Sequence, residues 1–352
     1  MLADTNEDSG CHLLFIDYEN NTGRAFRAPA GSGAWALDEV PGQRLIVGTF
    51  YDGTFMVFDL NKMEFTRTIK FPGEGYIWNH AIGLDGRIYG GTYGGGKLGA
   101  LDLQTYELED CGAPAKPNMY LRYVSTIPDG RILCQFGMEE PVRMVYDPSA
   151  KTFTKAPEHL QAATQGVSWG GYFIAYRTVC DGRTLEVVKW PFPLPPNPNE
   201  TWTVDVQVTT PETLVVKQGA SFLRYQAGDK DLTLITDTNL RGRALALGKN
   251  GELLGVRGQD YFVVKPGDKE VKLRPIPVES GPRPSMFLEA DDDGRIWGGP
   301  HFGQTLFWMD PASKKTVNTS NICDAGGEVY DVAFDHGKTY AAAYAGGDIV
   351  RY

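Results

Sequence analysis

Short turn sequences recur along this chain at a nearly constant interval, and this recurrence limits the possible folds more than any other feature. Between the glycines of successive turns the steps are 44, 44, 40, 81, 43 and 43 residues, and the step of 81 spans two units. The turns lie at Gly42, Gly86, Gly130, Gly170, Gly251, Gly294 and Gly337, and the missing one falls near Pro211 and Glu212. A period of about 42 residues indicates a chain of repeated supersecondary units.

Apolar, strand-like runs flank each turn, as Ala81–Leu84 and Arg87–Thr92 do around Gly86. A third run of alternating character follows, such as Phe55–Asp59, and often a fourth, such as Glu64–Ile69. Four antiparallel strands per unit of about 40–50 residues are typical of a β-propeller blade. No segment carries a clear helical period. We therefore predict an all-β chain that forms a single β-propeller of four-stranded antiparallel blades, with eight blades favoured and seven as the alternative.

The repeat leaves no boundary inside the chain, so residues 1–352 are predicted to form one domain. An N-terminal segment at about 11–28 resembles the third and fourth strands of a blade, whereas residues 328–352 supply a first, second and third strand. We expect the N-terminal strand to complete the last blade and so close the ring, because closure removes open sheet edges. One third-type strand is then left over. Either Cys11–Asp17 lies outside the ring or the natural chain continues past Tyr352.

A proline-rich segment interrupts the rhythm at Trp190–Asn199, where five of ten residues are proline. Such a segment cannot join a sheet ladder and must be extended. We expect a rigid connection that replaces an outer strand. The alternative is a wall of a binding face or a docking segment for a partner.

Charge and composition exclude several classes of protein. The formal net charge of −10 argues against a general nucleic-acid binder, which needs a basic surface. No run approaches the roughly 18 apolar residues of a membrane-spanning helix. The first residues are acidic and polar, unlike a signal peptide, so the default location is cytoplasmic, with a periplasmic or secreted form open if a signal was removed. Five cysteines without a CxxC pair predict neither a zinc site nor a disulfide framework.

Propeller strand order predicts which residues share a surface. The loops that lead into first strands and the loops between second and third strands lie on one face, which we call the near face. It collects arginines, two of the five histidines and many aromatic residues. The candidates for catalysis are His80, His301, Tyr93 and Tyr344. The candidates for substrate binding are Arg122, Arg243, Arg257, Arg177, Trp35, Trp78, Asn79, Tyr123, Glu328 and Tyr330.

These residue types suit the binding of an acidic sugar. A planar guanidinium binds a carboxylate through two parallel hydrogen bonds, and flat aromatic rings stack on sugar faces. In β-elimination an arginine would neutralise the uronate carboxylate, a histidine would remove the C5 proton and a tyrosine would protonate the leaving oxygen. For either histidine alone, a structural hydrogen bond is the commoner role. No residue is assigned to a metal or cofactor, although a divalent metal is left open.

The strand rhythm of residues 80–93 and of Leu306–Pro311 resembles that of the bacterial propellers that include the streptogramin lyases. It is also similar to quinoprotein-like propellers, propeller-type polysaccharide lyases and, more broadly, WD40/YVTN-like repeats. The resemblance covers essentially the whole chain at the level of the repeat. Streptogramin lyases place histidines and an acid around magnesium, and no matching histidine pair occurs here. Propeller lyases that act on uronate polymers combine histidine, tyrosine and arginine on one face, a type of site that fits His80, Tyr93, Arg122, Arg257, His301 and Tyr344.

The leading functional hypothesis is a carbohydrate-active lyase that cleaves an anionic, uronate-containing saccharide by β-elimination. Its partner would be an acidic oligosaccharide or another small anionic ligand. The first alternative is a non-catalytic propeller that binds glycans or proteins with the same face. The second is a glycoside hydrolase or isomerase that uses a metal or a near-face carboxylate, for which Asp52, Glu139 and Glu328 are the candidates.

Overall fold

The computed structural model describes residues 2–4, 10–279, 281, 283–323, 327–344 and 346–352. Over these residues the chain is almost entirely β-structure, and the sole helical element in this part is a 3₁₀ turn, η1 (Glu158–Leu160). The prediction of an all-β chain with little helix is confirmed.

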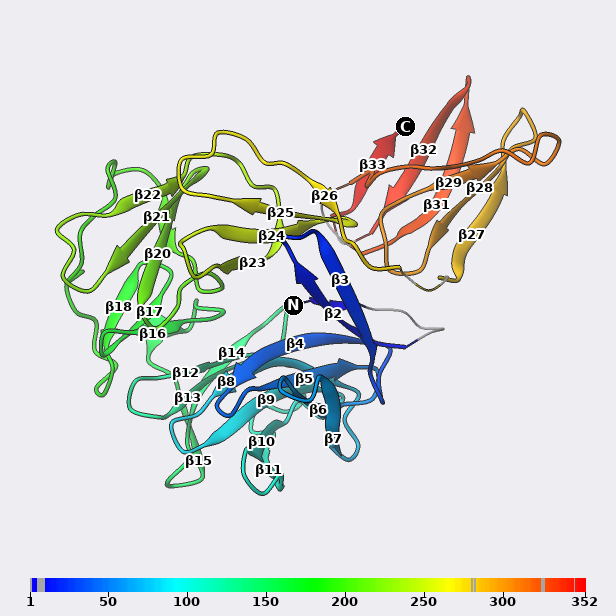
Figure 1. Ribbon diagram of the computed structural model, residues 1–352. Helices are drawn as coiled ribbons and strands as arrows, with labels where there is room; N and C mark the ends of the chain where they lie inside the picture. The colour runs from blue at the N-terminus through cyan, green and yellow to red at the C-terminus, as the bar shows by residue number, and fades with distance from the viewer. Residues whose placement is uncertain (1, 5–9, 280, 282, 324–326, 345) are drawn as a thin grey trace.

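Eight sheets follow one another from Gly33 onward, each a meander of consecutive antiparallel strands (Figure 1). We number them first to eighth in chain order. The first sheet contains β4 (Gly33–Val40), β5 (Arg44–Phe50), β6 (Thr54–Asp59) and β7 (Glu64–Lys70). The second contains β8 (Tyr76–Ile82), β9 (Arg87–Tyr93), β10 (Leu98–Asp102) and β11 (Leu108–Gly112). The third contains β12 (Leu121–Thr126), β13 (Ile132–Phe136), β14 (Val142–Asp147) and β15 (Thr152–Lys155).

The remaining five sheets keep the same order of strands. The fourth contains β16 (Val167–Trp169), β17 (Tyr172–Ala175) and β18 (Thr178–Asp181). The fifth contains β19 (Trp202–Val204), β20 (Thr213–Gln218), β21 (Ser221–Gln226) and β22 (Thr233–Thr236). The sixth contains β23 (Arg243–Leu247), β24 (Leu253–Arg257), β25 (Asp260–Val264) and β26 (Arg274–Pro275). The seventh contains β27 (Ser285–Ala290), β28 (Ile296–Pro300), β29 (Phe307–Met309) and β30 (Thr316–Asn318), and the eighth β31 (Val329–Asp335), β32 (Lys338–Ala343) and β33 (Asp348–Arg351).

The predicted turns connect the first strand to the second strand in every one of these sheets. The turn without a glycine corresponds to the longer connection between β19 and β20, which contains Pro211 and Glu212. In the other seven, φ of the turn glycine lies between 58° and 95°, a left-handed conformation in which a side chain is strained. The recurrence of glycine therefore follows from the backbone geometry that these turns need. Many four-stranded antiparallel sheets of this kind are consistent with a β-propeller, and the number of blades in a closed ring, eight or seven, stays a prediction.

The proline-rich segment covers the fourth sheet, which has three strands. The ring of Phe192 lies 5.1 Å from that of Trp169 and 5.8 Å from that of Tyr225, and Trp190 lies 4.8 Å from Trp202 (distances between ring centroids). The segment thus packs apolar rings against the fourth and fifth sheets. As the sequence predicts for a segment with five prolines, it joins no sheet; its role as a rigid replacement of an outer strand stays a prediction.

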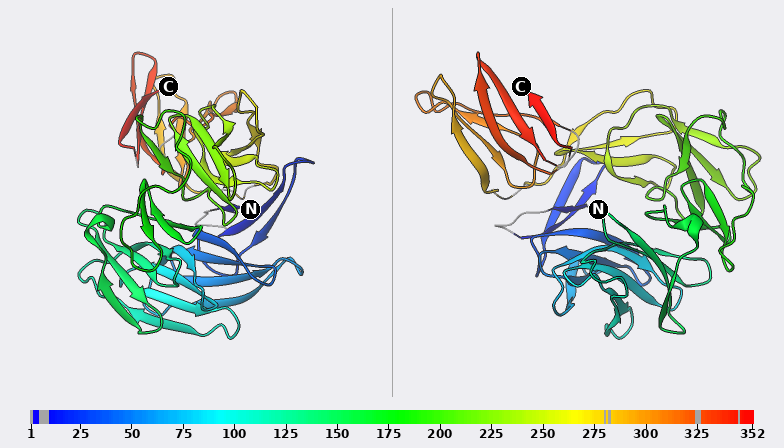
Figure 2. Two further views of the ribbon diagram at one scale, coloured as in Figure 1. Left: turned by 90° about the vertical axis from the view of Figure 1, so that its left-hand side faces the viewer. Right: turned by 180° about the vertical axis from the view of Figure 1, so that it is seen from behind.

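Neighbouring sheets share buried side chains, and this sharing shows how the sheets are connected. Buried clusters link the first sheet to the second, and so on in order to the sixth. The seventh and eighth sheets share a cluster with each other. None of the clusters formed by the described residues joins the sixth sheet to the seventh. In agreement with this, the seventh and eighth sheets project from the rest of the molecule (Figures 1 and 2).

A further sheet precedes the eight and consists of β1 (Leu2–Asp4), β2 (His12–Asp17) and β3 (Thr22–Arg27). We call it the N-terminal sheet. On one side, its Phe15 and Phe26 pack on Phe58 of the first sheet, with ring centroids 5.4 and 5.1 Å apart. On the other side, the Tyr18 hydroxyl donates a hydrogen bond to Glu252 (2.6 Å) near the sixth sheet. The N-terminal sheet therefore lies between the first and sixth sheets (Figure 1).

This arrangement corrects the expected strand pairing at the ends of the chain. Residues 11–28 were expected to complete the last blade at residues 328–352, but β2 pairs with β1 on one side and β3 on the other, and β31–β33 form a separate sheet. The physical reason is local. A short turn brings β2 and β3 together as a hairpin, and the hairpin buries Leu13 against Leu45 and Phe58 of the first sheet.

Candidate functional site

A register shift recurs near the start of the first strand in six of the eight sheets; in β23 it lies between Arg243 and Ala246, and in the other five it is a β-bulge of one common form. In each of these five, one extra residue interrupts the register with the second strand. A bulge bends its strand and redirects the side chain of the extra residue. These residues are Trp35, Trp78, Arg122, Met286 and Tyr330. Four of the five are predicted substrate-binding residues, and the bulge explains why they occupy equivalent places in the repeat.

Aromatic rings from the first three sheets gather at these bulges. Trp35 and Trp78 have ring centroids 5.0 Å apart. Tyr93 lies between two further rings, 4.7 Å from Tyr76 and 4.5 Å from Tyr120. Trp35 is 52% exposed, so the rings offer a surface to a ligand as well as packing together. We call the set the aromatic platform; its members are Trp35, Tyr51, Tyr76, Trp78, Tyr93 and Tyr120.

Arg122 lies on this platform. Its guanidinium carbon is 5.6 Å from the ring centroid of Trp78 and 5.5 Å from that of Tyr123. Within the described residues, its guanidinium has no hydrogen bond or ion pair with another side chain or the backbone. An arginine placed on aromatic rings without a carboxylate partner has its hydrogen-bond donors available to an anion.

Two tyrosines of the platform, Tyr76 and Tyr120, are protonated at neutral pH because their pKa values are raised. Burial, followed by the neighbouring Tyr93 and Tyr120, raises the pKa of Tyr76. Burial and Tyr93 likewise raise the pKa of Tyr120, and Tyr344 adds to that rise. Their hydroxyls are therefore hydrogen-bond donors to a ligand and proton donors in chemistry, and they are poor bases.

Carboxylates in the same loops accept hydrogen bonds from other groups of the protein. Asp52 accepts hydrogen bonds from the amide of Gly31 (3.1 Å) and from the Thr49 hydroxyl. Glu74, 5% exposed, accepts from the Thr92 hydroxyl (2.6 Å). Both carboxylates fix the conformation of the loops behind the platform. This use disfavours Asp52 as the acid or base of a hydrolase.

His80 does not reach the near face, which corrects its predicted role as a base. Its side chain is fully buried, and Nδ1 lies 3.1 Å from Oδ2 of Asp38. The imidazole stacks on Phe55 with ring centroids 5.5 Å apart, and Nε2 is buried without a partner among the described residues. The strand explains this placement, because Trp78 occupies the bulge and His80, two residues later, points into the space between the first two sheets. A base must contact its substrate, and this ring contacts only protein.

The loops of the last two sheets approach the platform. Phe302, next to His301, has its ring centroid 5.4 Å from that of Phe50, which packs under Trp35 at 5.5 Å. Tyr330 and Tyr344 stack nearly parallel at 5.3 Å and are 49% and 53% exposed. The contact of Phe302 with Phe50 therefore brings loops of the seventh and first sheets together.

The other predicted binding residues have separate roles. Arg257 donates hydrogen bonds to the backbone carbonyls of Arg241 (3.2 Å) and Leu240, so it supports a loop. Asn79 accepts a hydrogen bond from the amide of Val124 (3.0 Å) and connects the second and third sheets. Glu328 is 7% exposed and is therefore remote from solvent. The backbone of Arg243 lies in β23, and its side chain is outside the described part of the chain.

Sequence reasoning missed two members of this surface. Tyr76 stacks on Tyr93, and Phe50 supports Trp35 from below. Tyr76 is the first residue of β8 and lies two residues before Trp78, so its place in the repeat could have indicated it. Phe50, 6% exposed, gave no signal that separates it from an ordinary core residue.

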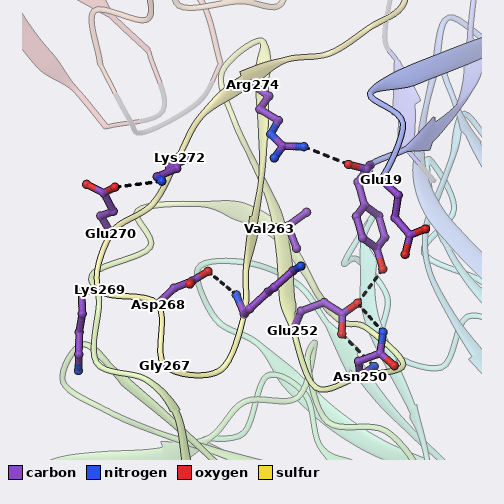
Figure 3. A pocket seen from close by; sticks show the side chains of 12 residues that line it. Glu19, Asn250, Glu252, Val263, Gly267, Asp268, Lys269, Glu270, Lys272 and Arg274 are labelled. Atoms are coloured by element: carbon purple, nitrogen blue, oxygen red, sulfur yellow. Dashed lines mark hydrogen bonds and ion pairs between the residues drawn. The ribbon is translucent and has the colours of Figure 1, made fainter.

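A polar cavity of about 670 Å³ lies elsewhere, where the N-terminal sheet meets the sixth sheet (Figure 3). Charged side chains of both signs line it, and several are already paired, as Lys272 is with Glu270 (3.4 Å). Glu252 accepts the hydroxyl of Tyr18 (2.6 Å) and the amide of Asn250 (2.8 Å). The cavity is thus part of the contact between the two sheets, and the aromatic platform is the better candidate site.

The described residues contain neither a cluster of metal-ligating side chains nor a membrane-spanning helix. No group of three or more His, Cys, Asp or Glu side chains in this part of the chain is arranged to hold a metal ion. No helix among the described residues has the length and apolar character needed to cross a membrane.

Comparison with known proteins gives similar folds and no family. No protein family matches the sequence, and no curated protein is significantly similar to it. The dihydro-heme d1 dehydrogenase NirN is 14% identical with a TM-score of 0.45, over 93% of this chain and 73% of that one. Streptogramin B lyase is 12% identical with a TM-score of 0.38, over 97% of each chain. The Cps50 (Swd1) β-propeller domain of Myceliophteria thermophila is 14% identical with a TM-score of 0.49, over 83% of this chain and 98% of that one.

These likenesses are structural and include β-propellers, among them the streptogramin lyase that the repeat resembles. The proteins concerned differ in activity, and the TM-scores are below 0.5, so the likenesses carry no argument about function. The case for a function rests on the platform.

Proposed function

We propose that the aromatic platform binds a saccharide that carries a carboxylate. The observation that carries this proposal is Arg122, which lies on Trp78 without an acidic partner among the described residues. On a chain with a net charge of −10, such an arginine favours an anionic ligand at this place. The neighbouring rings supply stacking surfaces, and the tyrosine hydroxyls supply hydrogen-bond donors.

Cleavage of the bound sugar by β-elimination is the second candidate. It is supported by Tyr93 and Tyr120, whose rings lie near Trp78 and Arg122, and by the contact of the His301 loop with Phe50 through Phe302. In this scheme His301 takes the C5 proton and the C–H electron pair forms the C4–C5 double bond. The C4–O bond breaks, and a platform tyrosine protonates the departing oxygen. Arg122 stabilises the carbanion-like transition state through the carboxylate.

Titration with oligosaccharides tests the binding proposal. Oligouronates and neutral oligosaccharides of the same length would be added to the protein, and tryptophan fluorescence and heat of binding would be measured. We expect the uronates to bind and the neutral sugars to bind at least tenfold more weakly. Arg122→Gln should weaken uronate binding about 10- to 100-fold, since a hydrogen bond to a charged group contributes about 1.5–3 kcal/mol.

Arg183→Gln is the matched control, because Arg183 is an exposed arginine in the turn after β18, at the opposite end of that sheet from the near face. Equal binding of neutral and acidic sugars, or unchanged binding by Arg122→Gln, would contradict the proposal. The ultraviolet absorbance of an unsaturated uronate, measured in the same samples, tests elimination separately. If a bound uronate never yields this product, the protein is a binding module.

A further inference from the structure

A second arginine on the near face repeats the arrangement of Arg122. Arg177 lies between β17 and β18, and its guanidinium carbon is 4.7 Å from the ring centroid of Trp202, the first residue of β19. Its side chain is exposed, and it has no hydrogen bond or ion pair within the part of the chain that the structure describes. Beside it, Tyr176 is 48% exposed and bonds through its hydroxyl to Thr164 (2.7 Å).

The two arginines belong to adjacent sheets and to the same face. Arg122 lies at the start of the third sheet, and Arg177 lies in the loop between the second and third strands of the fourth. These sheets are joined at their first strands, where the amide of Gly166 donates to the Ser125 hydroxyl (3.2 Å) and the Ser168 hydroxyl donates to the carbonyl of Thr126 (2.5 Å). Strand order then places both arginine–tryptophan pairs along one surface, from the second sheet to the fifth.

We infer that Arg177 and Trp202 form a second anion subsite and that the ligand is a polyuronate chain with at least two carboxylates. The inference rests on the proposed function. Trp202 is 4% exposed, so its ring fixes the plane of the guanidinium and offers little stacking surface of its own. This subsite therefore recognises charge, whereas Trp78 and Arg122 recognise charge together with a sugar face.

Two acidic residues in a near-face loop of the third sheet restrict where the ligand carboxylates can lie. Glu139 and Glu140 are exposed in the corresponding loop of the third sheet, between β13 and β14. They repel an anion placed next to them, so the ligand is favoured when its carboxylates lie on the arginines. A chain whose carboxylates lie on the two arginines, with uncharged parts beside the glutamates, fits this pattern better than a compact anion.

Binding as a function of chain length tests the inference. Uronate oligomers from one to eight sugars would be titrated into the wild-type protein, Arg177→Gln, Arg122→Gln and the control Arg183→Gln. In the wild-type protein, affinity should rise 10-fold or more once a chain spans both subsites, because the second contact becomes intramolecular. Arg177→Gln should abolish this rise and leave binding of the shortest oligomer unchanged. Arg122→Gln should weaken binding at every length.

The outcomes separate this inference from the proposed function. If Arg177→Gln shows the wild-type rise with length, the second subsite is wrong and the platform proposal stands. If no uronate binds at any length, the proposed function fails, and the inference fails with it. Tight binding of single-stranded DNA that also depends on Arg177 would overturn the polyuronate assignment, because nucleic acids combine stacking with anionic charge as well. Arg177→Lys, which retains the charge, should keep part of the rise and would show that loss in Arg177→Gln is not misfolding.

Discussion

The contact between the N-terminal sheet and the segment after β26 depends on a glycine, Gly23. A Cβ at this position would lie 2.5 Å from Cγ2 of Val278 and 2.7 Å from the backbone oxygen of Pro277. Carbon and oxygen atoms do not approach so closely without displacement, and one of the two neighbours is backbone. The backbone conformation of Gly23 itself is not left-handed, so any effect of a side chain comes from this close approach alone.

We predict that Gly23→Ala destabilises the protein and that Gly75→Ala does not. Overpacking of this kind costs about 1–3 kcal/mol. Alanine also restricts the unfolded chain and stabilises by about 0.4–1 kcal/mol where it fits, so the net loss at Gly23 should be about 0.5–2 kcal/mol. Gly75 is the matched control, because its φ is also not left-handed and its nearest neighbour would be 3.6 Å away. Its replacement should be neutral or slightly stabilising.

Urea titration followed by tryptophan fluorescence would measure both free energies of unfolding. Hydrogen exchange would locate the effect, with faster exchange expected in residues 22–27 and 243–275 and little change in the first sheet. Adding Val278→Ala removes one of the two close contacts, and so should restore part of the lost stability. If Gly23→Ala and Gly75→Ala have the same stability, the N-terminal sheet does not pack on residues 277–278, and the arrangement of the sheets described above is wrong.

Two further predictions concern stability. The hydrogen bond to Glu252, followed by burial, raises the pKa of Tyr18 from 10.0 to about 12. The stabilisation of the folded state by the protonated Tyr18 hydroxyl is therefore present below pH 10 and is lost as the pH rises to about 12. Tyr18→Phe should therefore lose less stability over this range than the wild-type protein, in unfolding titrations repeated at each pH; an equal loss would refute the linkage. Phe192→Ala, in the segment that covers the fourth sheet, should cost up to about 3 kcal/mol, since Phe192 is partly buried and full burial corresponds to 3–5 kcal/mol. Leu194→Ala, at a side chain that is 53% exposed, is the control and should change the unfolding free energy little; equal effects would mean that the segment is not packed as described.

Much of the fold could be predicted because the repeat is local. A glycine turn between two apolar runs specifies a hairpin wherever it occurs, and seven such hairpins follow the predicted order, together with an eighth whose longer connection lacks the glycine. Strand order in a meander then determines which loops share a face. For this reason the sequence also placed Trp35, Trp78, Tyr93 and Arg122 on one surface, although no two of them are close in the chain.

The tertiary structure decided which of these candidates can meet a ligand. Whether a side chain lies on the surface depends on single-residue bulges, and a shift of one residue moves a side chain to the other face of a sheet. The bulge occupies position 78, so that Trp78 is partly buried at the edge of the platform and His80, two residues later, lies in the interior. Similarly, only the folded loops show that Arg257 bonds to backbone carbonyls while Arg122 and Arg177 lie on aromatic rings.

The sequence pattern also does not determine where the N-terminal strands pack; the tertiary structure does. The residues of β2 and β3 have the alternation of blade strands, and that pattern does not specify which sheet they join. The choice depends on the competition between pairing with a distant strand and closing a short hairpin. The hairpin needs only a short turn and buries Leu13, Phe15 and Phe26 against the first sheet, so local closure determines the contact. Periodicity in the sequence therefore specifies the units, and the packing between units specifies their neighbours.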